Sequence, residues 1–239
     1  TDSIDNFDVW AFMDNVGGTV LTDEDVEKVN GVWGYHNLQY WAPNHIYYFA
    51  ALSPMNTTNI TNKTLATDDT ALLGLGKITY KNPNGKEDLL YAMETATTPT
   101  TMSELATKGM DAVNMQFKHL LSKVKFTFQN GFPSEYNSLK VSNIRMKVPN
   151  AGSVDLTQSR PYQWEVSSAY DALTLSFGNA VNAKFPSKGT LLGSGEVGES
   201  EFECLTLPVK EGAKLLIEFD VELYQGSEVA IPKNTRTAE

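Results

Sequence analysis

The sequence predicts an all-β protein made of two tandem β-sandwich domains, and three observations support this fold class. Short runs of apolar residues alternate with polar ones along most of the 239-residue chain. Glycine, proline and asparagine cluster between these runs, where turns are expected. Helical periodicity is scarce. The length suits sandwiches of about 100 to 130 residues each, so we expect domains at residues 1–133 and 134–239.

In the first half of the chain, alternating apolar side chains predict five strands, at residues 7–12, 46–51, 77–80, 113–117 and 124–128. The turn sequence Asn82-Pro83-Asn84-Gly85 follows the third of these and predicts a hairpin before Leu89. Residues 56–70 are dense in asparagine, threonine and aspartate and predict an exposed loop.

In the second half of the chain, the alternating pattern resumes after the polar segment 131–138 and predicts a strand at 139–146. The clearest strand covers residues 215–223, where Ile217 and Phe219 alternate with Glu218 and Asp220. This pattern predicts one buried face and one face mostly in water.

Only two short helical segments are predicted. One spans Asp23–Val29, with Thr22 as its N-cap and Asn30-Gly31 as its stop signal. The other is a turn at 103–108. Few helices among many strands agree with a sandwich fold.

Charge and cysteine content exclude several classes of protein. The formal net charge is −10, which argues against binding to nucleic acid and to anionic lipid. Cys204 is the one cysteine, so no internal disulfide forms, and its apolar neighbours predict a buried side chain. No stretch has the roughly 20 apolar residues of a transmembrane helix. Thr1 is expected to be a mature start from which an export signal was removed.

No motif predicts catalysis, a cofactor or a metal ion. Gly193-Ser194-Gly195-Glu196-Val197-Gly198 has the glycine spacing of a dinucleotide loop, but a strand rather than a helix is expected to follow it. The three histidines lack metal-ligand spacing. A secreted enzyme stays as a minor hypothesis, because paired carboxylates are recognised only in space.

An aromatic cluster follows the predicted first helix and allows two interpretations. It could form part of a sandwich core, as aromatic residues often do, or a platform on which a sugar ring stacks. Its members are Trp33, Tyr35, Tyr40, Trp41, Tyr47, Tyr48 and Phe49.

Several segments of the first half resemble the fimbrillin-like family of Bacteroidales, which includes major and minor fimbrial subunits. They are GVWGY at 31–35, QYWAPN at 39–44, YYFAALSP at 47–54, DLLYA at 88–92 and VNMQFKHLLSKV at 113–124. The family shares a tryptophan strand, a YWP segment, a FFAYSP segment and a F-x-H-x-L-S-K-V strand in this order. The second half resembles the family more loosely, at 139–148 and 214–224.

The resemblance implies two transthyretin-like sandwich domains with Greek-key topology, the second incomplete at its C-terminus. It implies export as a lipoprotein precursor, although this chain has no lipid-bearing cysteine near its start, and assembly on the outer membrane into an extracellular fimbria. In the family, a protease commonly cuts after an arginine and removes the first strand. A strand from a neighbouring subunit then fills the groove that is left.

Two functions follow from this resemblance. The first is a structural fimbrial subunit that polymerises by donor-strand addition, supports adhesion, and has other fimbrial subunits and a host or bacterial receptor as partners. Its groove or edge strand is expected at Phe7, Val9, Trp10 and Phe12. The alternative is a surface-anchored or fimbrial-tip adhesin that binds glycan or protein through Trp33, Tyr35, Tyr40 and Trp41.

Overall fold

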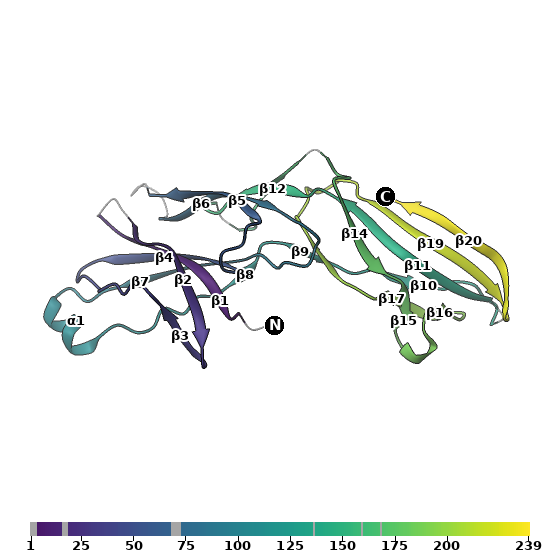
Figure 1. Cartoon of the computed structure of the whole chain (residues 1–239), viewed down its shortest axis with the longest axis horizontal. Coiled ribbons are helices and arrows are strands. Elements are labelled where there is room, and N and C mark those ends of the chain that lie inside the picture. The colour runs from purple at the N-terminus through teal and green to yellow at the C-terminus, as the bar shows by residue number, and fades with distance from the viewer. Residues whose placement is uncertain (1–3, 16–18, 68–72, 136, 159, 168) are drawn as a thin grey trace. The chain divides into compact units, whose positions relative to one another are not determined.

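The computed structural model describes residues 4–15, 19–67, 73–135, 137–158, 160–167 and 169–239 (Figure 1). Strands make up 54% of the chain and helices 4%, so the predicted all-β fold class is confirmed. The helical elements in these ranges are α1 (Met102–Lys108) and the 3₁₀ turn η1 (Pro186–Lys188). The helical turn predicted at 103–108 is therefore confirmed. The hydroxyl of Thr101 caps α1 by accepting a hydrogen bond from the Glu104 N–H.

The chain folds into two compact units, and each unit is assembled from three separate segments. The first unit comprises Thr1–Lys81, Asp88–Leu121 and Gly152–Glu165. The second comprises Asn82–Glu87, Ser122–Ala151 and Val166–Glu239. The chain thus passes between the units five times, after residues 81, 87, 121, 151 and 165. These units do not coincide with the contiguous segments 1–133 and 134–239, because each segment contributes strands to both.

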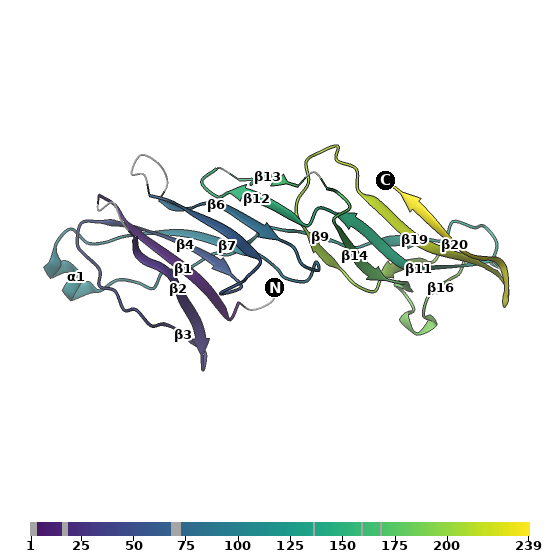
Figure 2. The same cartoon turned by 45° about the horizontal axis from the view of Figure 1, so that its top comes forward.

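The first unit contains a six-stranded sheet and a four-stranded sheet, called here the large and the small sheet. The large sheet is antiparallel, in the order β3 (Val32–Tyr35), β2 (Thr19–Val29), β1 (Asn6–Met13), β4 (Ile46–Ser53), β7 (Leu90–Thr97) and β8 (Lys118–His119). The small sheet, visible in Figure 2, has the order β13 (Trp164–Val166), β12 (Ala151–Asp155), β6 (Gly74–Lys81) and β5 (Ile60–Ala66).

The two sheets pack face to face around the main core of the first unit. A Cβ atom at Gly74 of β6 would lie 3.8 Å from both Ala50 of β4 and Met93 of β7, so the sheets approach closely there. The largest side chains that are fully buried in this unit include Phe12, Leu52, Ile78, Tyr80 and Tyr91. Burial of such side chains is the main source of stability in a sandwich.

The opposite, outer face of the large sheet carries a second apolar cluster. It contains Phe7, Val9 and Val26 together with two small residues, Ala51 and Ala92. Because Ala51 and Ala92 leave room above β4 and β7, the ring of Phe117 reaches to 5.1 Å from that of Phe7. The large sheet is therefore apolar on both faces.

The second unit is also a sandwich. One sheet has the order β14 (Leu173–Gly178), β11 (Asn137–Val148), β19 (Leu216–Gln225) and β20 (Glu228–Ala238), with β16 (Leu191–Leu192) also paired to β11. Two smaller sheets are β10 (Thr127–Gln129), β17 (Val197–Ser200) and β15 (Ala180–Asn182), and β18 (Cys204–Thr206) with β9 (Ser122–Val124). Ring contacts of Phe126 with Phe177 and of Phe128 with Phe219, 4.7 and 5.2 Å apart, join the layers.

The predicted helix over Asp23–Val29 is wrong, because these residues belong to β2. Asn30 and Gly31 have φ values of 53° and 82°, and they connect Val29 to its partner Val32 in β3. Two central residues with positive φ make a type I′ turn, whose twist matches a two-stranded hairpin. The Asn-Gly pair is therefore a hairpin turn and not a helix stop.

The predicted hairpin at Asn82-Pro83-Asn84-Gly85 is also wrong. The strands on either side of it, β6 and β7, lie in different sheets of the first unit. The segment itself belongs to the second unit, where Asn82 is buried and donates from Nδ2 to the Leu205 carbonyl at 2.8 Å. The local turn sequence is real, but strand pairing depends on residues far away in the chain.

Two other segments differ in part from their predictions. The segment 56–70, predicted as a loop, contains β5, and its residues 68–70 lie outside the described residues. Along 113–117, odd-numbered side chains are half-buried and even-numbered ones are exposed, as predicted. These five residues form no strand, and β8 begins only at Lys118. The glycine-rich 193–198 segment leads into β17, so no helix follows it.

Candidate functional site

The first unit holds the predicted groove residues Phe7, Val9, Trp10 and Phe12, and all four are buried in β1, between 1% and 8% exposed. β1 pairs with β2 on one side and with β4 on the other, so it is a central strand and the expectation of an edge strand is not met. Phe7 and Val9 face the outer cluster, while Trp10 lies under the ammonium group of Lys63 from β5, 4.7 Å from the ring centre. Removal of β1 would therefore open both faces of the large sheet.

The arginines of the sequence bear on how such a strand could be removed. The first arginine is Arg145, in β11, and the others are Arg160, which precedes Pro161, and Arg236 in β20. An arginine-specific cut within this sequence therefore leaves β1 covalently attached to the rest of the first unit's large sheet.

Asp8 introduces a buried carboxylate into the middle of β1. It is 3% exposed, and its Oδ2 accepts a 2.9 Å hydrogen bond from the Asn56 N–H. Its Oδ1 has no hydrogen-bond partner among the described residues. Burial raises the pKa of Asp8 to about 6, and the nearby charges of Asp23 and Asp25 contribute to the rise. Sequence reasoning missed this residue, because its burial depends on the packing of two sheets.

The structure divides the aromatic cluster between the two interpretations. Trp41 is half-buried and packs edge-on against Tyr47 and Phe49, with ring centres 4.7 and 5.9 Å away, so it belongs to the folded core. Trp33, Tyr35 and Tyr40 are 43%, 40% and 90% exposed. These three form the solvent-accessible part of the predicted ligand site.

Trp33 and Tyr35 share one face of β3, because residues two apart in a strand point the same way. The Trp33 ring contacts that of Phe7, with ring centres 5.3 Å apart, and Lys28 lies 5.6 Å from the Trp33 ring centre. Val29, Val32 and Leu38 are also exposed, at 60%, 70% and 70%. We call the exposed apolar side chains on and after β3 the β3 apolar surface: Trp33 and Tyr35 on one face of the hairpin, Val29 and Val32 on the other, and Leu38 and Tyr40 in the segment that follows. Exposed apolar surfaces of this kind mark interaction sites.

Glu24 holds the chain that follows β3. Its Oε1 accepts hydrogen bonds from the N–H groups of His36 and Asn37, both at 2.8 Å, and its Oε2 accepts one from the Asn37 side chain. Burial opposes ionisation of Glu24, but the hydrogen bonds from Asn37 and His36 outweigh it, so the pKa of Glu24 is lowered. A residue that the sequence placed in a helix thus anchors the loop carrying Leu38 and Tyr40.

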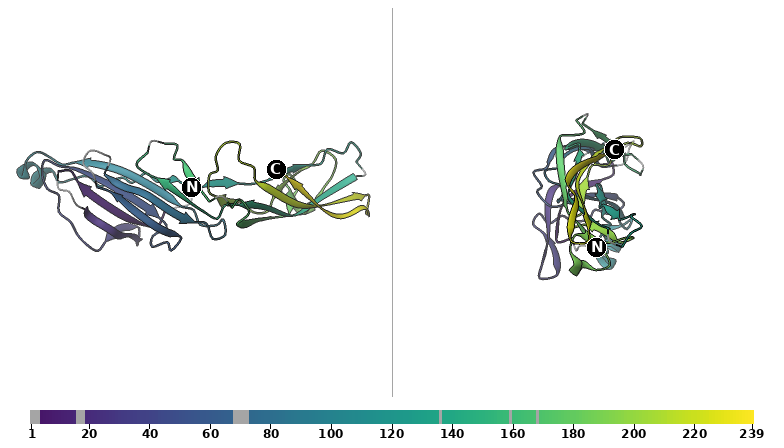
Figure 3. Two further views of the ribbon diagram at one scale, coloured as in Figure 1. Left: turned by 90° about the horizontal axis from the view of Figure 1, so that it is seen from above. Right: turned by 90° about the vertical axis from the view of Figure 1, so that its right-hand side faces the viewer.

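The edge of the second unit is formed by the hairpin of β19 and β20, seen from above in Figure 3. All eleven residues of β20 are exposed, and among the described strands β20 pairs with β19 alone, along one side. Asp220 of β19 holds β20 in place through two side chains of that strand: its carboxylate contacts Lys233 Nζ at 2.9 Å and Thr235 Oγ1 at 2.7 Å. Asn143 donates to the same carboxylate at 3.1 Å. Lys233, with these two hydrogen-bond donors, lowers the pKa of Asp220 to about 2.

The prediction that Asp220 lies on a wet face is therefore wrong. Asp220 is 3% exposed, whereas its neighbours Ile217 and Phe219 are partly buried against the core. The reason is that side chains of the two neighbouring strands, Lys233 and Thr235 of β20 and Asn143 of β11, surround the carboxylate. A single strand pattern does not reveal that a further strand lies beside it.

Other titratable groups pair locally. Within the described ranges, no group of three histidine, cysteine, aspartate or glutamate side chains is placed to hold a metal ion. His45 and His119 each contact one carboxylate at 2.8 Å, Asp14 and Asp88 respectively. Cys204 is buried, as predicted, and burial raises the pKa of its thiol. Neither described helical element has the length and hydropathy of a transmembrane span.

Comparisons with known proteins found a family and solved structures that are similar to this chain. A model of the fimbrillin-like family matches residues 1–229. The fimbrial anchor protein Mfa2 from Porphyromonas gingivalis is 13% identical, with a TM-score of 0.41 over 91% of this chain and 69% of that protein. A candidate adhesin from Bacteroides thetaiotaomicron is 12% identical, with a TM-score of 0.45 over 94% of this chain and 70% of that one. No curated protein sequence matches significantly.

Proposed function

Because this chain belongs to the fimbrillin-like family, we propose that it is a structural subunit of a cell-surface fimbria that joins neighbouring subunits by strand addition and supports adhesion. Membership makes it a fimbrial-type protein of a structural and adhesive family. The chain associates with other fimbrial subunits in this proposal, derives from an outer-membrane lipoprotein precursor, and takes part in donor-strand exchange.

The observation that carries the proposal is β20. It is an eleven-residue edge strand, exposed over its whole length, with one side unpaired in the described structure. An open edge presents N–H and C=O groups to which another chain can add a strand. Val229 and Ile231, 51% and 49% exposed, add apolar contact area along it.

β1 supports the same proposal less directly. A groove at Phe7, Val9, Trp10 and Phe12 would exist only after β1 had left its place between β2 and β4. Exposure of a fully buried apolar side chain costs about 1.5 to 3 kcal/mol, so the departure of four would be costly without a strand to replace them. Addition at β20 needs no such departure, and we therefore place it there.

The experiment is electrophoresis of the purified chain in SDS without heating, which preserves strand-exchanged assemblies. We expect a ladder that collapses on boiling, and its loss in the double variant Val229→Lys, Ile231→Lys, since lysine on an edge blocks strand pairing. Val32→Lys, at a more exposed apolar site on β3, should keep the ladder. A monomer under all conditions, or a ladder that survives the double variant, would refute strand addition at β20.

The second candidate function is adhesion through the β3 apolar surface, and the exposure of Trp33, Tyr35 and Tyr40 favours it. Aromatic faces open to solvent can stack on sugar rings or fill pockets of a protein receptor. A glycan array tests it: binding should be lost in Tyr40→Ala, whose side chain is 90% exposed and contributes little to folding. If Tyr40→Ala and Tyr35→Ala both bind glycan as strongly as the wild type, these rings are excluded as the platform.

A further inference from the structure

β7 is paired along one side only over much of its length. β4 pairs with all eight residues of β7, from Leu90 to Thr97. On the other side, β8 pairs only with Leu90 and Tyr91. The remainder of that side, residues 92–97, faces no strand in the described part of the chain.

The direction of the backbone groups identifies which of them are open. The Thr98 N–H donates to the His45 carbonyl on the β4 side, and the Leu120 N–H donates to the Leu89 carbonyl on the β8 side. Alternate residues of a strand direct their N–H and C=O groups to opposite neighbours. The outward groups are therefore those of the odd-numbered residues Met93, Thr95 and Thr97. No described backbone group pairs with them.

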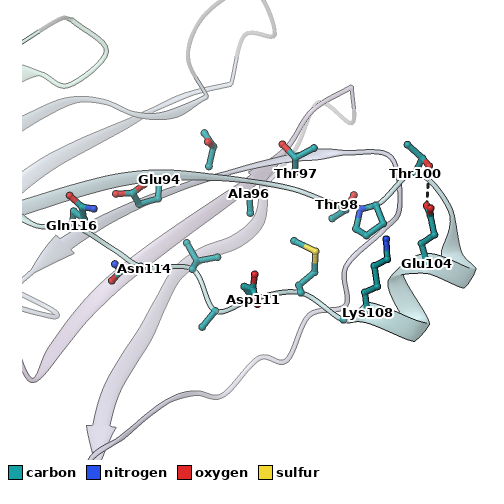
Figure 4. A pocket seen from close by; sticks show the side chains of 16 residues that line it. Glu94, Ala96, Thr97, Thr98, Thr100, Glu104, Lys108, Asp111, Asn114 and Gln116 are labelled. Atoms are coloured by element: carbon teal, nitrogen blue, oxygen red, sulfur yellow. Dashed lines mark hydrogen bonds between the residues drawn. The ribbon is translucent and has the colours of Figure 1, made fainter.

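A cavity of about 790 Å³ lies beside this open edge (Figure 4). Its second wall is the segment 109–116, which runs from α1 towards β8. Within the described residues, the backbone of 110–116 makes no hydrogen bond to other backbone groups either. Met115 faces the outer cluster, which holds the segment on the large sheet at that point. Two unpaired stretches of backbone thus flank one cavity.

The dimensions suit an extended peptide. Residues 93–97 offer an edge of about 16 Å at 3.3 Å per residue. The volume falls within the roughly 300 to 1,000 Å³ typical of ligand pockets. A strand placed here would pair with β7 on one side and could pair with 110–116 on the other, which satisfies backbone groups that are open in the free protein.

The charge of the walls indicates which peptide fits. Glu94 and Asp111 line the cavity, and no described cation forms an ion pair with either. A third carboxylate, Glu104, accepts hydrogen bonds from the hydroxyls of Thr100 and Thr101. Lys108 is the one basic residue among the described residues that line the cavity. The cavity is therefore acidic overall. An acidic wall favours a segment with lysine or arginine side chains as the occupant.

We propose that the cavity between β7 and residues 109–116 is a peptide-acceptor site. It takes an extended, lysine- or arginine-bearing segment of a different protein as an added strand beside β7. Backbone pairing to Met93, Thr95 and Thr97 gives the affinity, and Glu94 and Asp111 select basic side chains. The site is independent of β20, so its test and the ladder test can fail separately.

The test uses the whole chain and an acetylated, amidated seven-residue peptide that alternates threonine with lysine. Fluorescence anisotropy of the labelled peptide should show saturable binding, and hydrogen exchange should slow at the amides of Thr95 and Thr97. A peptide with glutamate in place of lysine, and one with a central proline, should not bind. Absence of binding by the lysine peptide overturns the proposal.

Variants separate the two sources of affinity. Thr95→Pro removes an outward N–H that β4 does not use, and it should weaken binding by roughly tenfold, while Thr95→Ala should have little effect. Glu94→Gln and Asp111→Asn should each weaken it by about threefold, less at high salt. Binding unchanged by Thr95→Pro overturns the site.

Two further outcomes also overturn the proposal. Concentration-dependent dimerisation of the free chain that Thr95→Pro abolishes would identify a second copy as the occupant. Strong protection of the Thr95 and Thr97 amides in the free protein would show that 110–116 itself closes onto β7.

Discussion

Replacement of Asp8 by asparagine is expected to stabilise the first unit at neutral pH. The side chain of Asp8 is buried in β1, and one of its carboxylate oxygens has no partner among the described residues. Asparagine has nearly the same shape and can still accept the hydrogen bond from the Asn56 N–H. It carries no charge, so the desolvation cost that raises the pKa of Asp8 to about 6 disappears.

The magnitude follows from the linkage between protonation and folding. A carboxyl group whose pKa is higher in the folded protein binds its proton more tightly there. The stabilisation that this tighter proton binding gives the folded protein is complete below the unfolded pKa of 3.8. It is lost as the pH rises through the folded pKa of about 6. The interval from 3.8 to 6 corresponds to about 3 kcal/mol at about 1.4 kcal/mol per pKa unit. About 2 kcal/mol of this falls between pH 4 and pH 8.

The assay is equilibrium unfolding in guanidinium chloride at several pH values, followed by tryptophan fluorescence. All four tryptophans, at positions 10, 33, 41 and 164, lie in the first unit, so the signal reports on that unit. The stability of Asp8→Asn minus that of the wild type should rise by about 2 kcal/mol from pH 4 to pH 8. Other carboxylates cancel in this difference.

Glu27→Gln is the matched control, because it removes one negative charge from an exposed position of β2. Its difference from the wild type should stay nearly flat with pH. The reasoning about Asp8 is refuted if Asp8→Asn destabilises the protein at pH 8, or if its difference from the wild type does not change with pH.

Three other substitutions, one of them with a matched control, test the remaining structural claims. Gly85→Ala should destabilise the protein by about 2 to 4 kcal/mol in thermal unfolding, since the residue has a φ of +73° and a Cβ would lie 2.7 Å from a Leu175 methyl group. Gly34→Ala, with open space around it, should change stability by less than about 0.5 kcal/mol, and equal effects would contradict the close approach at Gly85. Because the pKa of Asp220 is lowered to about 2, its ionised carboxylate stabilises the fold above the usual carboxyl pKa, and this stabilisation is lost as the pH falls towards 2. Asp220→Asn should therefore destabilise the protein by about 2 kcal/mol at pH 7 and speed hydrogen exchange in β20. Unchanged exchange in β20 would show that Asp220 does not fasten it. Glu24→Gln should speed amide exchange at positions 36 and 37 by about tenfold, as the charge-assisted hydrogen bonds weaken, while exchange in β11 stays the same.

The sequence was informative wherever a structure is determined by neighbours along the chain. The alternation over 7–12 and 139–146 predicted β1 and β11, and the segment 103–108 predicted α1. The Asn30-Gly31 pair shows the limit of such local signals, since the same two residues fit a helix stop and a type I′ turn. Only the pairing of Val29 with Val32 decides between them.

Features that depend on distant segments were not predictable from the pattern. Tyr80 and Leu90 flank a turn sequence, yet their strands enter different sheets. Asp220 looked solvated because the strand that buries it comes later in the chain. For the candidate site, composition placed Trp33, Tyr35 and Tyr40 together with Trp41, but packing alone showed that Trp41 is part of the core. The open edge of β7 left no trace in the sequence, because an unpaired strand and a paired one can have the same residues.

The repeated passage of the chain between the two units has a consequence for how such a protein can change over generations. A gene that encodes two contiguous domains can exchange one of them by a single recombination event. Here no single crossover point leaves both units whole, because the segments of the two units alternate along the chain. The pair must therefore be inherited together, and diversification is confined to substitutions and to loops such as the one carrying Tyr40. A chimera built by joining two relatives at one point should yield insoluble protein, whereas exchange of that loop should be tolerated.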